Sequence, residues 1–150
     1  MKKRIFWNIF LSSLFAALLL GGVILIAQYR SYETLVFSQL SSECDYVKSG
    51  LLASADESAY LSSLPKGTRI TLISQDGTVL FDTSADALKL ENHADRPEVA
   101  AAQANGEGTS SRYSTTQLMK NFYYARLLTD GRVLRVATSQ QSVLGLLNKL

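Results

Sequence analysis

Residues 69–82 of the chain read RITLISQDGTVLFD, and this stretch decides the fold of the second half of the sequence. Residues 69–74 and 78–82 are two short runs rich in aliphatic and β-branched side chains, separated by Gln75-Asp76-Gly77. An Asp-Gly pair between two such runs is typical of a β-hairpin, because glycine readily adopts the positive φ of a tight turn. The stretch therefore predicts two antiparallel strands joined by a two-residue Asp-Gly turn.

The same pattern occurs again near the end of the sequence. Residues 121–127 resemble a strand, Thr129-Asp130-Gly131 predicts a turn, and residues 132–139 predict the returning strand. Residues 109–114 are polar but include β-branched and aromatic side chains, and they predict a shorter strand. Three further strands are therefore expected after the first hairpin.

An Ala-rich stretch between the two hairpins predicts a helix. Residues 98–105 follow Pro97, which suits the first turn of a helix, and they precede Gly106, which ends it. Asp95 is the predicted N-cap, because a side-chain carboxylate can accept from the free N–H groups of the first turn.

Upstream of the first hairpin, residues 28–55 predict a long amphipathic helix. The stretch contains no proline, and its apolar side chains recur at spacings of three, four or seven: Tyr29, Tyr32, Val36, Leu40, Val47 and Leu51. Such a stripe either packs on the domain that follows or forms a coiled-coil seam with a second chain. Cys44 is predicted to be a small buried side chain of this helix, with an intermolecular disulfide or a redox role as the alternative.

The N-terminal segment, residues 5–27, contains no charged side chain. A helix of that length is about 35 Å long, enough to cross a hydrocarbon core of about 30 Å. The basic sequence Lys2-Lys3-Arg4 precedes it, so the positive-inside rule places the N-terminus in the cytoplasm and the rest of the chain on the extracytoplasmic side of the cell membrane. A cleaved signal peptide is the alternative, but the run is longer than a signal core and has Leu25 at the −3 position.

These elements predict an α+β fold with a central antiparallel sheet and helices on a face, in the order of a PAS-like domain of PDC/Cache type. The expected organisation is a cytoplasmic N-terminus, a transmembrane helix, a long amphipathic signalling helix, an extracytoplasmic PAS-like domain, and the start of an exit helix or second span: residues 1–4, 5–27, 28–55, 56–139 and 140–150.

Composition excludes several classes of function. The net charge of +2 is more than supplied by Lys2, Lys3 and Arg4, so the rest of the chain has no broad basic surface and nucleic acid is not an expected partner. One Cys and one His do not form a zinc site of ordinary spacing. We expect no metal, no cofactor and no catalytic residues in these 150 residues.

Two stretches give the sequence a recognisable character: residues 91–99, ENHADRPEV, and residues 106–114, GEGTSSRYS. Combined with the charged N-terminus, the membrane segment, the first hairpin ending in Phe81-Asp82 and the VLRV strand at 133–136, they resemble the N-terminal sensory part of phosphate-regulon-type sensor histidine kinases of Gram-positive bacteria. The resemblance covers essentially the whole chain.

The resemblance implies a sensor module that transmits a signal across the membrane as part of a homodimer. A small-molecule ligand or a partner membrane protein would supply the signal. A kinase part following residue 150 would use ATP and Mg and would act on a response regulator. The sensor domain of a chemoreceptor or cyclic-dinucleotide synthase is the alternative of the same class, and a membrane-anchored extracytoplasmic enzyme is the alternative of another class.

Arg96, Arg112 and Tyr124 are the predicted ligand-binding residues. A guanidinium group binds carboxylates and phosphates with two parallel hydrogen bonds, although pairing with nearby acidic residues is the competing interpretation for both arginines. Tyr124 belongs to the cluster Phe122-Tyr123-Tyr124, whose alternate rings should point to opposite faces of the sheet and serve packing or line a pocket. His93 is expected to fix the loop before the Pro97 helix.

Overall fold

The computed structural model describes residues 2–65, 67–114 and 119–141. Contacts divide the chain into two compact units, Met1–Leu35 and Val36–Leu150, and each is described on its own. Helix α1 (Lys2–Ala53) begins in the first unit, and among the described residues it is the one helix long and apolar enough to cross a membrane. An 18-residue window of this helix reaches a mean hydropathy of 2.6 and is not buried.

The second unit is built on one five-stranded antiparallel sheet with the strand order β2-β1-β5-β4-β3. Both predicted hairpins and the additional strand are present, so the predicted α+β fold with a central antiparallel sheet is confirmed. The strands are β1 (Arg69–Ile73), β2 (Val79–Asp82), β3 (Glu107–Ser114), β4 (Met119–Leu127) and β5 (Val133–Gln141).

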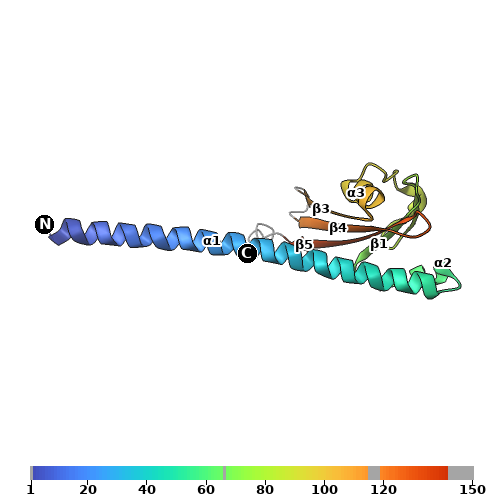
Figure 1. Cartoon of the computed structure of the whole chain (residues 1–150), viewed down its shortest axis with the longest axis horizontal. Helices are drawn as coiled ribbons and strands as arrows, with labels where there is room; N and C mark the ends of the chain where they lie inside the picture. Colours follow the sequence, from blue (N-terminus) through green and yellow to red (C-terminus); the bar gives the residue numbers. More distant parts are fainter. Residues whose placement is uncertain (1, 66, 115–118, 142–150) are drawn as a thin grey trace. The chain divides into compact units, whose positions relative to one another are not determined.

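Two helices cover the two faces of the sheet (Figure 1). Residues 36–51 of α1 pack on one face, and α3 (Pro97–Asn105) packs on the other. The α1 face buries a large apolar cluster that includes Ile70, Leu72, Phe122, Leu134 and Val136. The α3 face buries a smaller one made of Ile73, Val99, Ala102, Ala125 and Val133. Side chains alternate between the faces along each strand, which separates the two clusters.

The apolar stripe of α1 packs on the sheet. Its buried members recur every three or four residues and so lie on one side of the helix: Val36, Leu40, Cys44, Val47 and Leu51. The packing interpretation is therefore confirmed for these positions. A coiled-coil seam through Val36 and Leu40 is wrong, because the sheet of the same chain already covers them.

Cys44 is fully buried in this layer, as predicted, and its thiol lies 3.8 Å from the backbone oxygen of Leu134. Burial raises the pKa of the Cys44 thiol to about 12. The thiol therefore stays protonated and acts as a small core side chain.

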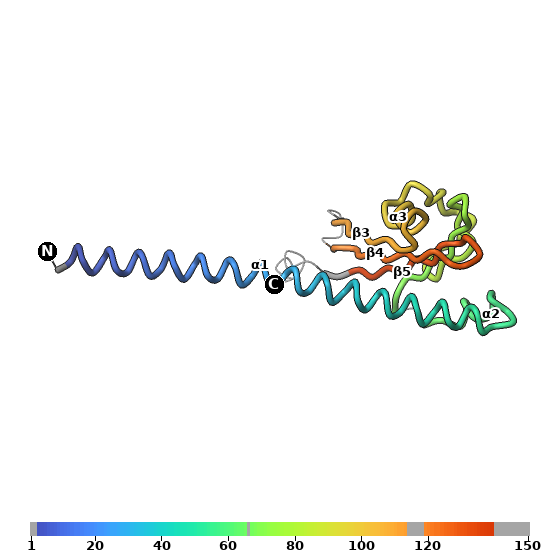
Figure 2. The backbone as a smooth tube through the Cα atoms, viewed as in Figure 1, coloured from blue at the N-terminus to red at the C-terminus, as the bar shows by residue number. Residues whose placement is uncertain are grey.

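The two hairpin turns share one geometry, which differs from the predicted two-residue turn. The N–H of Gly77 donates to the oxygen of Ser74 at 3.0 Å, and that of Gly131 donates to the oxygen of Leu128 at 3.1 Å. Each glycine thus closes a β-turn with its N–H and has a positive φ, 90° for Gly77 and 85° for Gly131, which is the pattern of a three-residue loop with a glycine bulge. Figure 2 shows both turns at the same end of the sheet.

Three local features differ from the sequence prediction. Helix α2 (Glu57–Ser63), capped by Asp56, and the short 3-10 helix η1 (Ala87–Lys89), capped by Asp86, were not predicted. Pro97 takes the first helical position, so the N-cap of α3 is Arg96 rather than Asp95. The Arg96 side chain has only hydrogen-bond donors and makes no capping bond. Gly106 ends α3 with a φ of 89°, as predicted.

The boundaries of the domain predicted at residues 56–139 shift slightly at both ends. Helix α1 ends at Ala53, and β5 continues to Gln141, beyond the predicted end of the sheet at residue 139. The remainder of the predicted exit helix, residues 142–150, lies outside the described residues.

Candidate functional site

A buried carboxylate on α3 organises the charged residues of the α3 face. The side chain of Glu98 is fully buried and pairs with Arg112 of β3 through its Oε2. Its Oε1 lies 3.5 Å from Nη1 of Arg135 on β5. Two positive charges therefore flank one buried negative charge. Their attraction offsets the cost of removing the Glu98 carboxylate from water.

The close approach of α3 to β3 depends on Gly108. A Cβ at this position would overlap with the backbone oxygen of Glu98 and would lie 2.7 Å from the Cβ of Ala101. The missing side chain allows the helix to lie directly on the strand, which brings Glu98 within reach of Arg112.

The charged network continues across the sheet from β5 to β2. Arg135 donates from Nη2 to the Thr71 hydroxyl at 3.2 Å, and that hydroxyl donates to Asp82 at 2.8 Å. Arg69 completes the chain with a bond of 2.9 Å from its Nε to Asp82. Burial alone would raise the pKa of Asp82, but the hydrogen bonds from Ser84, Thr71 and Arg69 outweigh it and lower that pKa. Burial lowers the pKa of the Arg135 guanidinium.

Arg112 and Arg96 both lie on the α3 side of the sheet, but they differ in how firmly they are held. Arg112 pairs with Glu98 and stacks over the ring of Tyr123, 4.5 Å from its centroid. Arg96 is partly exposed at the start of α3, and its nearest acidic partner is the exposed Glu91 at 4.0 Å. Each arginine therefore makes an ion pair with an acidic residue, as the competing interpretation expected.

His93 holds the loop before α3 against the first hairpin turn, as predicted. Its backbone N–H donates to the oxygen of Gly77 at 2.8 Å, and its own oxygen accepts from the N–H of Arg96 at 3.1 Å. The imidazole is buried, and its Nδ1 has no hydrogen-bond partner among the described residues. Burial, together with the charges of Arg135 and Arg96, lowers the pKa of His93.

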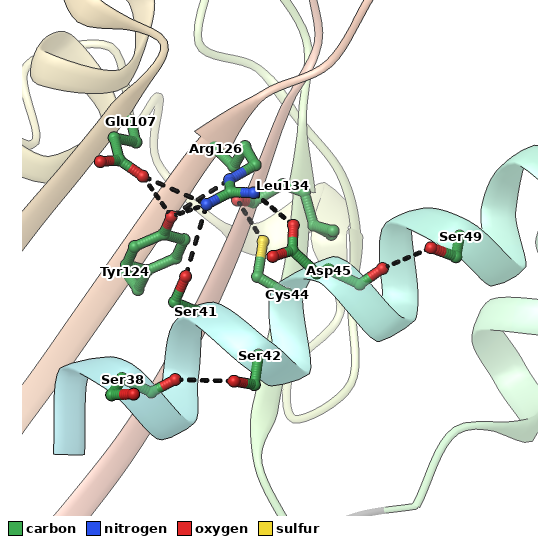
Figure 3. Close-up of polar contacts among 10 residues, drawn as sticks. All are labelled: Ser38, Ser41, Ser42, Cys44, Asp45, Ser49, Glu107, Tyr124, Arg126 and Leu134. Atoms are coloured by element: carbon green, nitrogen blue, oxygen red, sulfur yellow. Dashed lines mark hydrogen bonds and ion pairs between the residues drawn. The ribbon is translucent and has the colours of Figure 1, made fainter. Parts of the chain in front are cut away.

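Tyr124 lies on the opposite face of the sheet, next to α1 (Figure 3). Its hydroxyl donates to Glu107 at 2.6 Å and accepts from Nε of Arg126 at 3.1 Å. Arg126 also pairs with Asp45 of α1 and lies 3.4 Å from the hydroxyl of Ser41. We call this group of five residues the α1 clasp, because it ties α1 to β3 and β4 by polar contacts.

The three predicted ligand-binding residues do not form one site. Arg112 and Arg96 belong to the α3 side, and Tyr124 belongs to the α1 clasp. Arg135 and Arg126 were not predicted as site residues, although each contacts several polar groups, and Glu98 was expected only as one of the acids that could pair with Arg96 or Arg112. Alternation along β4 could have placed Arg126 beside Tyr124, whereas no sequence signal indicated that Glu98 is buried. In the described ranges no group of three or more His, Cys, Asp or Glu could hold a metal ion.

No protein-family model and no curated protein matches the chain. Among solved structures, the chain is similar to the extracellular domain of rpHK1S-Z16, a protein assigned as a histidine kinase, with 24% sequence identity and a TM-score of 0.43. The similarity covers 59% of this chain and 39% of that one, so the chain spans well under half of the structure it matches.

Proposed function

We propose that the chain is the extracytoplasmic sensor module of a membrane-bound, two-component sensor histidine kinase of the phosphate-regulon type. The observation that carries the proposal is the double role of α1. The helix contains an apolar segment long enough to cross a membrane, and its residues from Val36 to Leu51 complete the core of the sheet domain. The resemblance of residues 91–99 and 106–114 to such kinases supports the kinase type.

The same helix offers a route for the signal. A receptor must have at least two arrangements, and a ligand or partner shifts their populations only through a difference in affinity. Helix α1 supplies core side chains and two members of the α1 clasp, Ser41 and Asp45. A rearrangement of β3 and β4 therefore acts directly on this helix. The proposed signal is therefore a displacement of α1 relative to the sheet.

The proposed orientation has the N-terminus in the cytoplasm and the sheet domain outside. Lys2, Lys3 and Arg4 stand on one side of the apolar segment, and the positive-inside rule gives the orientation. A reporter enzyme that is active only outside the cytoplasm, fused after Ser139, is expected to be active. Activity of a cytoplasm-only reporter at the same position would reverse the topology.

In the proposed homodimer the two chains meet through the exposed side of α1 rather than through the side that carries Val36 and Leu40. Ser38 and Ser42 are exposed, whereas Val36 and Leu40 are buried by the sheet. In the full chain in membranes, with Cys44→Ser, we expect Ser38→Cys and Ser42→Cys to form disulfides between chains. Val36→Cys and Leu40→Cys should not form them, because the sheet of the same chain covers these positions. The sheet therefore keeps a second chain beyond the distance of about 7 Å between Cα atoms that a disulfide requires. Cross-linking at the buried pair alone would show that this surface is assigned wrongly.

The kinase assignment itself is tested by the coding sequence after Leu150. We expect a second apolar span, a helical phosphoacceptor histidine and an ATP-binding region, and Mg-dependent autophosphorylation of the full protein in membrane vesicles. A methyl-accepting coiled coil or a cyclic-dinucleotide synthase domain in that place would assign the chain to the alternative receptors. A stop codon directly after Leu150 would contradict every reading as a kinase.

A further inference from the structure

A groove of about 180 Å³ opens on the α3 face of the sheet and is lined by Arg69, Asn121, Tyr123, Ala137, Thr138 and Ser139. Its residues come from β1, β4 and β5, and no residue of α3 lines it. The strand register places Arg69 and Tyr123 opposite Ala137, and Asn121 opposite Ser139. The small side chain of Ala137 therefore leaves space between a guanidinium group and an aromatic ring.

Burial separates the charges around this groove by sign. The side chain of Asp82 is fully buried while that of its partner Arg69 is 37% exposed. The neighbouring pair repeats the arrangement, with Glu98 fully buried and Arg112 33% exposed. Both carboxylates therefore lie beneath the surface, and the solvent meets the outer edges of two guanidinium groups. Such a surface attracts anions although the ion pairs are formally neutral.

The groove also contains hydrogen-bond donors that the protein does not use. Arg69 binds Asp82 through Nε, and its two terminal nitrogens have no partner among the described residues. The Oδ1 of Asn121 accepts from the Ser139 hydroxyl at 2.7 Å, so its amide N–H groups are left without a partner in the part of the chain that the structure describes. Arg69 on β1 and Asn121 on β4 line the groove from the two sides of β5, so a guanidinium edge and an amide group both offer donors to it. Such donors suit the oxygens of a carboxylate or a phosphate.

We propose that this groove binds a small anion through one carboxylate or phosphate group, held by Arg69 and Asn121 beside the ring of Tyr123. The volume is below the range of about 300–1,000 Å³ usual for drug-sized ligands, so a small metabolite fits better than an extended one. Binding itself does not depend on the kinase assignment. Its role as the signal rests on the proposed function.

The test uses the full chain in nanodiscs of zwitterionic phosphatidylcholine lipids, so that no lipid headgroup with net negative charge competes. Malonate and inorganic phosphate are titrated by calorimetry at constant ionic strength, with malonamide as the uncharged counterpart of malonate. We expect at least one anion to bind with a Kd of about 1 mM, and malonamide not to bind. Backbone amide signals of Tyr123 and Ala137 should shift on binding.

Asn121→Asp is the decisive variant. It keeps the oxygen that accepts from Ser139, leaves the Arg69–Asp82 pair in place, and adds a negative charge while removing the amide donors. Anion affinity should fall by about tenfold or more. Asn105→Asp makes the same chemical change at the exposed end of α3, away from the groove, and should change affinity by less than about twofold.

Three outcomes overturn the site: no binding of either anion, equal loss in both variants, or binding that Asn121→Asp does not weaken. None of these outcomes changes the results expected from the reporter fusions or from the coding sequence after Leu150. Failure of the anion site can therefore be distinguished from failure of the kinase assignment. If the kinase assignment fails instead, the anion still binds and the Asn121→Asp effect persists.

Discussion

Gly77→Ala is expected to destabilise the protein by about 3 kcal/mol or more, whereas Gly131→Ala is expected to lose about 1–2 kcal/mol. Both glycines have a positive φ in the same type of turn, so the backbone strain is matched. The surroundings differ. A Cβ at Gly77 would overlap with the Asn92 side chain and lie 2.5 Å from the backbone nitrogen of Ala94, while a Cβ at Gly131 would have Gln75 as its nearest contact at 3.6 Å.

Urea unfolding of the full chain in detergent micelles, followed by the near-ultraviolet circular dichroism of tyrosine, measures this difference. Gly131→Ala serves as the matched control for Gly77→Ala. Equal midpoints for the two variants would mean that the loop around Asn92 does not pack on the first turn as described.

Glu98→Ala is expected to destabilise the domain by about 3–5 kcal/mol, because removal of one member of a buried ion pair leaves the other uncompensated. Among the described residues Glu98 is the one acid that forms an ion pair with Arg135, which would stay almost fully buried without it, and Arg112 would lose the acid beneath it. Glu91→Ala removes an acid of the same type from a largely exposed pair with Arg96, and it should change the stability by less than about 1 kcal/mol.

The same urea experiment compares these two variants. Glu98→Gln adds a further check, because the amide keeps the shape of the side chain and loses only the charge. A Glu98→Ala midpoint close to that of Glu91→Ala would show that the charged network on the α3 face adds little to stability.

The fold followed largely from local signals in the sequence. The positive φ of Gly77 and Gly131 follows from the Asp-Gly pairs themselves, although each loop has three residues rather than the predicted two. The helix after Pro97 has its own start and stop residues. The spacing of Val36 and Leu40 showed that they share one side of a helix, but it could not show what covers that side. Only the packing of residues far apart in the sequence decides between a sheet and a second chain.

The candidate site was much harder to predict. Alternation along β4 correctly indicated that Tyr123 and Tyr124 face opposite ways, yet the partners of each ring depend on register between strands. Glu98 has the sequence context of an ordinary surface residue in the first turn of a helix. Its burial results from Gly108 in a different element, which the local sequence of α3 does not reveal.

The shared core of α1 and the sheet has a consequence for proteolytic release of the domain. If a protease cuts between Ala53 and β1, the released sheet lacks the side chains of Val36, Leu40 and Val47. The apolar side chains on its α1 face are then exposed to water. Such a fragment would aggregate or be degraded rather than persist as a stable, separate domain. A cut that releases a stable domain must therefore lie before Val36, so that the liberated piece carries its own helix away with it.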